Sequence, residues 1–150
     1  MSGRLSALLA LLRTPWCCRT LESTDTRTNP KKTIVVRADL GMRKGKIGAQ
    51  AGHACEWGTI ADFTSGKPLT RCQQQYYDVR FRKVCLKVNS EAELVAIYDK
   101  AVAAGLPVKM VTDSGLTEFH GVPTKTCLAI GPCYDDDVDP ITGSLYLYLY

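Results

Sequence analysis

The sequence predicts an α/β sandwich. Four short apolar runs alternate along the chain with longer segments of helical pattern. The order strand, helix, strand, helix, strand and a fourth strand is typical of this class, and it makes the first three strands parallel with right-handed crossovers. The length of 150 residues suits a single folded domain, and 45% hydrophobic with 23% charged residues is the composition of a soluble globular protein.

The predicted strands are apolar runs, and the helices between them have recognisable ends. The strands cover residues 33–38, 84–88, 108–112 and 126–130. The helices cover residues 46–63, 69–80 and 90–104, and a short acidic helical segment covers 135–139. Ser90 and Glu93 form a capping box at the start of the third helix, and Gly105 ends that helix. Leucine and tyrosine alternate at 145–150, which indicates a strand-like tail.

Two loops should meet at one edge of this sheet. The loop at 39–45 follows the first strand, and the loop at 113–125 follows the third. Ligands of open α/β sheets bind outside the carboxyl ends of the strands. Because both loops lie at that edge, we expect them to share a cleft with the start of the helix at 46–63.

One stripe of that helix carries chemically active side chains. Its members are Lys46, Gln50, His53 and Trp57. Their spacing of i, i+4, i+7 and i+11 places them on one face of a helix with 3.6 residues per turn. A cation, an amide, an imidazole and an aromatic ring suit a polyanionic, partly aromatic substrate.

The loop at 113–125 adds a carboxylate, several hydroxyls and a second histidine to the cleft. With Lys46 and His53, Asp113 could activate a water and stabilise an oxyanion. Each residue also has a plainer interpretation. Asp113 could cap a turn before Gly115, His53 could be a structural histidine, and Lys46 could be a solvated lysine at the start of the helix. The chain has no recognisable nucleophile motif, no P-loop and no GxGxxG, which disfavours nucleotide hydrolysis and dinucleotide binding.

Several motifs resemble those of the type 2 peptidyl-tRNA hydrolases. They are VRADL at 36–40, MRKGKIGAQ at 42–50, HA at 53–54, DSGLT at 113–117, TCLAIGP at 126–132 and DPITG at 139–143. The resemblance covers about residues 32–148. It implies hydrolysis of the ester between a peptide and the 3′ ribose of tRNA, without metal or other cofactor, by a homodimer. The fold implied is a three-layer sandwich with a mixed, mostly parallel four-stranded sheet and helices on both faces.

The resemblance also implies the functional residues. They are Lys46, Gln50, His53, Asp113, Thr117 and Thr126. The glutamine is assigned to substrate binding and the other five to catalysis. We predict that Asp113 orients or activates water with help from His53, and that Lys46 stabilises developing negative charge or holds the terminal phosphate. Thr117 and Thr126 would supply hydroxyl hydrogen bonds.

This chain departs from the commoner family pattern beside the second loop. Glu118 stands where a glutamine usually follows the motif threonine, and the stretch 119–124 is one residue longer than usual. Gly41 and Arg43 replace a more typical lysine and glycine. Thr126 is therefore aligned through the strand that follows it, and an ordinary strand threonine is the alternative interpretation.

Charge is uneven along the chain although the net charge is only +4. Residues 1–60 hold ten Lys and Arg against four Asp and Glu, and residues 101–150 hold two against six. A basic half suits the phosphates of tRNA, so Arg37, Arg43 and Lys44 are predicted substrate-binding residues. Two non-enzymatic alternatives are a regulatory adaptor and an RNA-binding module on the same fold.

Residues 1–31 differ in composition from the domain predicted at 32–150. Residues 1–21 hold three arginines, several leucines and no acidic residue, which resembles a mitochondrial presequence. A short anchor, a secretory signal and a tail without a targeting role, which would leave the protein cytoplasmic, are the alternatives. The apolar run at 5–12 is too short to span a bilayer, so no integral membrane span is expected.

No metal site is expected from the sequence. The chain has two histidines, and its seven cysteines include no CxxC pair. Cys85 and Cys127 lie in apolar runs and are predicted to be core residues with reduced thiols.

Overall fold

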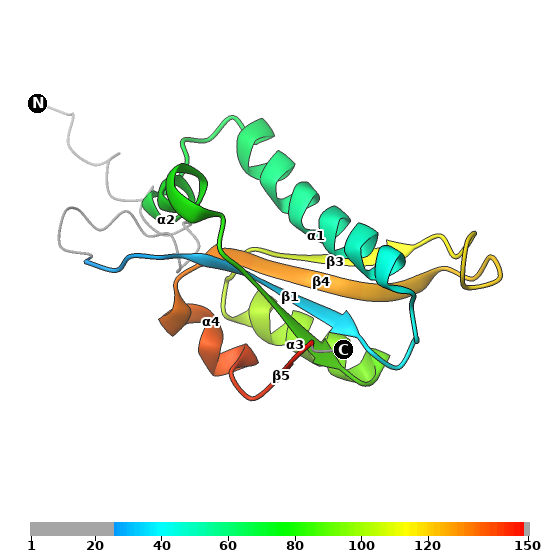
Figure 1. The fold of residues 1–150 in the computed structure, drawn as a ribbon. Coiled ribbons are helices and arrows are strands. Elements are labelled where there is room, and N and C mark those ends of the chain that lie inside the picture. The colour runs from blue at the N-terminus through cyan, green and yellow to red at the C-terminus, as the bar shows by residue number, and fades with distance from the viewer. Residues whose placement is uncertain (1–25, 149–150) are drawn as a thin grey trace, which may run out of the picture.

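The computed structural model describes residues 26–148, which form a sheet between two layers of helices (Figure 1). The leader predicted at 1–31 lies mostly outside the described residues, as do residues 149–150. The strands are β1 (Lys31–Arg37), β2 (Lys83–Val88), β3 (Val108–Asp113), β4 (Thr124–Cys133) and β5 (Tyr146–Leu147). The helices are α1 (Lys44–Thr64), α2 (Arg71–Gln75), α3 (Glu91–Ala103) and α4 (Asp135–Thr142), with a π-helical turn η3 (Tyr76–Arg80) after α2.

The sheet has five strands in the order β3-β4-β1-β2-β5, which corrects the predicted four. It is mixed but mostly antiparallel rather than mostly parallel, because β1 and β2 form a parallel pair and the other three pairings are antiparallel. The reason is that β4 returns between β1 and β3 and pairs with both. The leucine and tyrosine tail adds the fifth strand, β5, beside β2. The strands β1, β2 and β3 still run in one direction, so the loops after β1 and β3 do meet at one edge.

The two faces of the sheet are covered by different helices, as predicted. Alternation along β1 sends Ile34 and Val36 into the core under α1, while Val35 enters the core on the opposite face. The first core includes Ala54 of α1, and the second includes Leu94 of α3. Figure 1 shows α1 on one side of the sheet and α3 with α4 on the other. Helix α1 therefore lies directly over β4 and β3, where the candidate site is built.

The predicted helix ends are close to those observed, with two physical differences. The segment predicted as one helix at 69–80 divides into α2 and η3, and Phe81 ends it in the left-handed region with φ 47°. At α3, the Ser90 hydroxyl accepts from the Glu93 N–H as predicted, at 3.1 Å. The Glu93 carboxylate reaches back to the N–H of Asn89 instead of Ser90.

The acidic segment predicted near 135–139 starts α4, whose first turn holds Asp135, Asp136 and Asp137. Negative charge at a helix N-terminus is favourable because unsatisfied N–H groups lie there. Lys31 bridges to Asp135 as well, so this acidic group neutralises basic charge from the start of β1. Among residues 26–148, no helix combines the length and apolar character that crossing a bilayer requires.

Candidate active site

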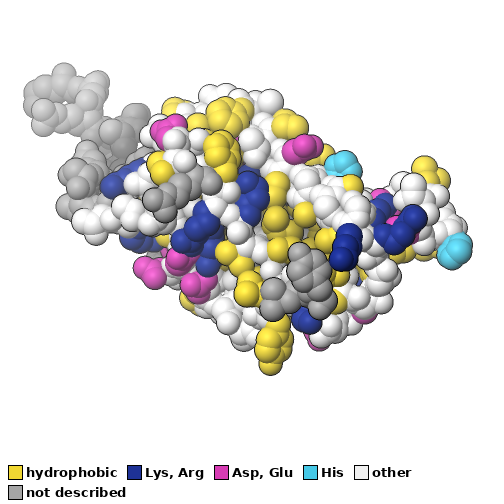
Figure 2. Space-filling model, in the orientation of Figure 1, with side chains coloured by type: hydrophobic (Ala, Val, Ile, Leu, Met, Phe, Trp, Pro, Cys, Tyr) yellow, Lys and Arg dark blue, Asp and Glu magenta, His cyan; other side chains and the backbone are white. Residues whose placement is uncertain are grey.

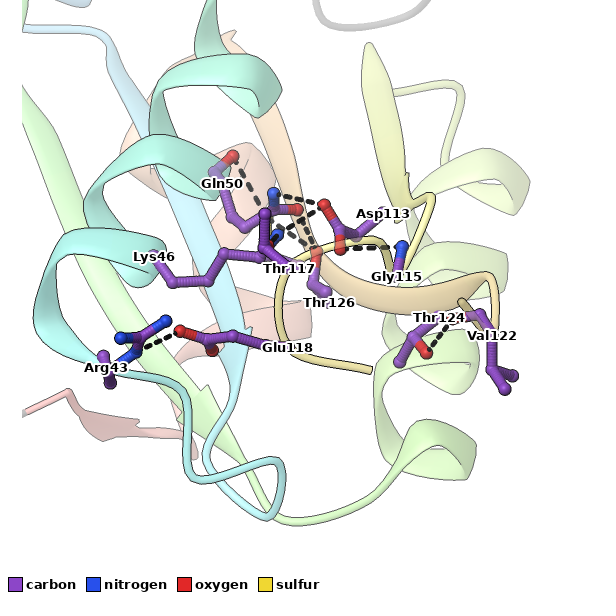
Figure 3. Close-up of polar contacts among 11 residues, drawn as sticks. Arg43, Lys46, Gln50, Asp113, Gly115, Thr117, Glu118, Val122, Thr124 and Thr126 are labelled. Atoms are coloured by element: carbon purple, nitrogen blue, oxygen red, sulfur yellow. Dashed lines mark hydrogen bonds and ion pairs between the residues drawn. The ribbon is translucent and has the colours of Figure 1, made fainter. Parts of the chain in front are cut away.

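An ion pair between α1 and the end of β3 forms the centre of the candidate site (Figure 3). Lys46 Nζ lies 2.6 Å from Asp113 Oδ1 and donates to Thr117 Oγ1 at 3.1 Å. The side chains of Lys46 and Asp113 are 13% and 12% exposed, so both still touch solvent. The two predicted loops thus converge here, and three of the predicted catalytic residues are in direct contact.

Gln50 joins this ion pair to a buried threonine of β4. Its Nε2 donates to Asp113 Oδ1 at 3.0 Å, and its Oε1 accepts from Thr126 Oγ1 at 2.6 Å. A carboxylate can only accept, so the amide must turn its NH₂ toward Asp113, and the threonine hydroxyl must be the donor. Gln50 is 3% exposed and Thr126 is fully buried. The chain Thr126–Gln50–Asp113 therefore orients the carboxylate from within the core.

The backbone at Gln50 is also fixed. Cys127 Sγ donates to the Gln50 carbonyl oxygen at 3.3 Å. Burial raises the pKa of the Cys127 thiol to about 12, so this thiol stays protonated and keeps its role as donor. The core placement predicted for this cysteine is confirmed, and the contact ties α1 to β4 at the residue that aligns Asp113.

Asp113 is held as an anion. Its hydrogen bond from Lys46 lowers the pKa of the carboxyl below its ordinary value, against the opposite effect of burial. The N–H of Gly115 also donates to Asp113 Oδ2 at 3.0 Å and acts in the same direction. Gly115 has φ +81°, and a Cβ atom there would lie 2.3 Å from the Val122 carbonyl oxygen. Only glycine can therefore hold this turn against the returning loop.

The site combines a fixed carboxylate, an ammonium and hydroxyl groups at the edge of the sheet where the sequence predicted a cleft. Such a set can hold a water and stabilise negative charge on an oxygen. Within the described part of the chain, no group of three or more His, Cys, Asp or Glu side chains could hold a metal ion. The carboxylate, ammonium and hydroxyl groups themselves can position protons and stabilise charge.

Comparison with known proteins identifies the family of this chain. The family model described as peptidyl-tRNA hydrolase PTH2 matches residues 30–148. This chain belongs to that family. A protein named peptidyl-tRNA hydrolase from Methanocaldococcus jannaschii is 43% identical over 118 residues, covering 78% of this chain and 98% of the relative. Relatives of the same name from Haloquadratum walsbyi and Aeropyrum pernix are each 43% identical, and cover 79% of this chain with 99% and 95% of their own lengths.

A solved structure supports the fold alone. A protein of unknown function from Agrobacterium tumefaciens strain C58 superposes with a TM-score of 0.53 at 12% identity. The match covers 82% of this chain and all of that chain. The α/β architecture is thus seen elsewhere in a protein of very different sequence.

Three other residues predicted for the site of this member of the peptidyl-tRNA hydrolase PTH2 family are His53 and Lys44 on α1 and Arg37 on β1. His53 is exposed on α1, one turn beyond Gln50. Lys44 is exposed at the start of α1. Arg37 is 9% exposed, and its guanidinium donates to Asp39, Glu91 and the carbonyl of Lys125. The structure therefore engages Arg37 in holding three segments together, and its predicted contact with substrate stays a prediction.

The sequence analysis did not predict that two residues that depart from the PTH2 family pattern, Arg43 and Glu118, contact each other. Arg43 Nε lies 2.6 Å from Glu118 Oε1, so two unusual residues form an ion pair between the residue that precedes α1 and the second loop. Phe119 of the same loop lies with its ring centroid 5.7 Å from Lys46 Nζ. The opposite charges of the two unusual residues were the one signal of this contact in the sequence.

Proposed function

We propose that this chain hydrolyses the ester bond between peptide and tRNA in peptidyl-tRNA, and so returns free tRNA. The observation that carries the proposal is the Lys46–Asp113 pair, aligned by Gln50 and Thr126, in a chain of the peptidyl-tRNA hydrolase PTH2 family. The named relatives support the reaction, and they do not favour a regulatory adaptor or an RNA-binding module.

In the proposed reaction, water attacks the ester carbonyl carbon. A bond forms between the water oxygen and that carbon, the bond from the carbon to the ribose oxygen breaks, and a proton passes to the ribose oxygen. The products are a peptide with a free carboxyl group and a tRNA with a free ribose hydroxyl. No electron transfer occurs, so the reaction needs no redox cofactor, and we propose that it needs no metal.

The charge state of Asp113 favours one of its two predicted roles. A general base works best when its pKa lies near the working pH. The pKa of Asp113 is lowered instead, so its carboxylate is a weak base and a stable anion. We therefore assign Asp113 to orienting water and Lys46 to stabilising the oxyanion, with Thr117 beside them as a hydrogen-bonding group. His53, exposed on the same helix, is the candidate that assists proton transfer.

Turnover of a defined peptidyl-tRNA by the purified chain tests the proposal. Release of free tRNA should continue in EDTA, provided that the tRNA is folded beforehand and its folding is checked in the same buffer. No turnover would contradict the activity. Turnover lost in EDTA and restored by a divalent ion, with tRNA folding unchanged, would contradict the metal-independent mechanism.

Basic residues at the start of α1 are expected to bind the tRNA backbone. Lys and Arg side chains appear in Figure 2 toward the end of the molecule where α1 begins. Lys44→Glu should raise the Michaelis constant more than it lowers the limiting rate, and affinity should fall as salt rises, because phosphate contacts release counterions. Lys67→Glu, an exposed charge reversal beyond the other end of α1, is the matched control. Affinity that is independent of salt would contradict this assignment.

The ion pair Arg43–Glu118 allows the effect of local net charge on tRNA binding to be separated from the effect of where the arginine lies. Exchanging the two residues, as Arg43→Glu with Glu118→Arg, keeps the local net charge, and we expect the ion pair to form again with its partners reversed. The exchanged protein should bind tRNA nearly as well as the unmodified one, whereas Arg43→Glu alone should bind it less well.

We infer that residues 1–31 direct the protein to mitochondria, from their basic and acid-free composition up to residue 21. A fluorescent protein carrying residues 1–31 should accumulate in mitochondria, and removing residues 1–25 should leave turnover unchanged. Diffuse cytosolic fluorescence would contradict the import proposal. We also infer a homodimer, from the resemblance to the family, and analytical ultracentrifugation measures it directly.

A further inference from the structure

An apolar groove lies along α1 beyond the candidate active site. The stripe that carries Lys46 and Gln50 extends along the same helix to Trp57 and Ile60. These two large apolar side chains are 45% and 56% exposed. They line a cavity of about 450 Å³ together with Ala61 and with residues 107–109. The side of α1 facing β3 is therefore apolar and open beyond the polar site.

The opposite wall of the groove comes from β3. Val111 packs in the core under α1, whereas Val108 and Met110 pack on the other face of the sheet. By the two-residue alternation of a strand, Lys109 points to the α1 side. Lys109 Nζ lies 5.1 Å from the centre of the Trp57 ring, which confirms that placement. Asp113 of the candidate site lies at the other end of the same strand.

The outer edge of β3 is open to a further strand. Among the residues that the structure describes, β3 pairs with β4 alone and ends the sheet on that side. A strand at the edge of a sheet presents main-chain N–H and C=O groups that an extended peptide can pair with. Such pairing does not depend on the sequence of the peptide.

The distance from the candidate site to this groove suits a short stretch of peptide. Seven residues of α1 separate Gln50 from Trp57, about 10 Å at 1.5 Å per residue. Four residues of β3 separate Asp113 from Lys109, about 13 Å at 3.3 Å per residue. An extended chain that starts at the ester would therefore reach Trp57 with about its third or fourth residue.

We propose, resting on the proposed hydrolase function, that this groove binds the peptide part of peptidyl-tRNA. The peptide lies extended along the free edge of β3, and the side chain of its third or fourth residue packs against Trp57 and Ile60. A substrate of arbitrary peptide sequence calls for this kind of surface, because main-chain pairing and an open apolar wall accept many side chains. The groove thereby makes the enzyme sensitive to peptide length.

Two substrates built on the same tRNA test the proposal. The short substrate carries a single N-acetylated amino acid, and the long substrate carries a hexapeptide with leucine as its third and fourth residues. Trp57→Ala should lower kcat/KM on the hexapeptide substrate on the order of 10-fold and leave the short substrate unchanged, because only the longer peptide reaches the ring. Tyr146→Ala is the control, since Tyr146 is 77% exposed on β5 at the opposite edge of the sheet. Equal losses on both substrates, or no loss on either, would overturn the proposal.

A binding measurement separates failure of the groove from failure of the activity. The hexapeptide is joined to tRNA through a 3′ amide, which resists hydrolysis, and carries a benzophenone side chain on its fourth residue. Light-induced cross-links should map to residues 57–61 or 107–109 of the unmodified chain. Cross-links there without hydrolysis of the ester substrate would overturn only the proposed function. Cross-links elsewhere would overturn the groove proposal. A dimer that Trp57→Ala converts to a monomer would also overturn it, because a second copy of the chain would then occupy the groove.

Discussion

Asp113→Ala is expected to lower the single-turnover rate by about 100-fold, the effect of losing the group that orients a reactant, while tRNA binding persists. The carboxylate is the acceptor common to Lys46 and Gln50, so its removal leaves the ammonium and the amide without the group that orients them. Affinity for tRNA should survive because it depends on basic residues at the start of α1. Single-turnover rate, tRNA affinity and melting temperature measured on the same protein check all three statements.

Asp113→Asn separates charge from hydrogen bonding. It should be nearly as damaging as Asp113→Ala if the anion matters, and milder if one acceptor is enough. Asp99→Ala on α3, an exposed aspartate, is the control for loss of a carboxylate elsewhere. If Asp113 only capped the turn at Gly115, its variants would melt earlier while the folded fraction reacted at the normal rate. That result would remove Asp113 from the mechanism and leave His53 as the main candidate.

The pH dependence follows from the direction of the Asp113 shift. The carboxyl has an ordinary pKa of 3.8, and the folded protein lowers it. The stabilisation that the ion pair gives is therefore present above the pKa of the unfolded chain and is lost as the pH falls through the lower folded value. No loss of activity between pH 5 and 8 should therefore come from Asp113, and a rate transition in that range would have to come from another group.

The sequence was informative about the site because its residues are local to two short segments. Lys46 and Gln50 lie on one helix face by spacing alone, and Asp113 heads a loop at the same sheet edge by topology. Predicting that these segments meet did not require knowing the order of the strands in the sheet. What mattered was that β1 and β3 run in the same direction, and that part of the prediction is correct.

The sheet order itself could not be predicted from local patterns. The apolar run at 126–130 reads the same whether it adds at the edge or inserts between β1 and β3, because a buried strand is apolar on both faces. Insertion makes it antiparallel to both neighbours, and this explains why the sheet is mostly antiparallel although β1, β2 and β3 run in one direction as predicted. Local patterns did not predict the contact between Glu118 and Arg43 either, because 75 residues separate the two in sequence.

Lys46→Met is expected to lower the single-turnover rate by about 100-fold to 1,000-fold, the range found when a group that stabilises an oxyanion is removed. Methionine keeps much of the length of the side chain but cannot donate to Asp113 or Thr117. Without the ammonium, the pKa of Asp113 should rise toward 3.8, because the main cause of its lowering is gone. The acid side of the pH–rate profile should therefore move to higher pH in this variant.

The double variant Lys46→Met with Asp113→Asn decides whether the two residues act as one unit. Groups in direct contact lose their contributions together, so the double variant should react about as slowly as the slower single variant. Lys100→Met on α3, an exposed lysine, is the control for removing a positive charge from the protein. Losses that multiply in full would show that Lys46 and Asp113 contribute independently. In that case Lys46 would act on the tRNA phosphate rather than on the reacting ester, and its variant should then bind tRNA more weakly in direct binding measurements.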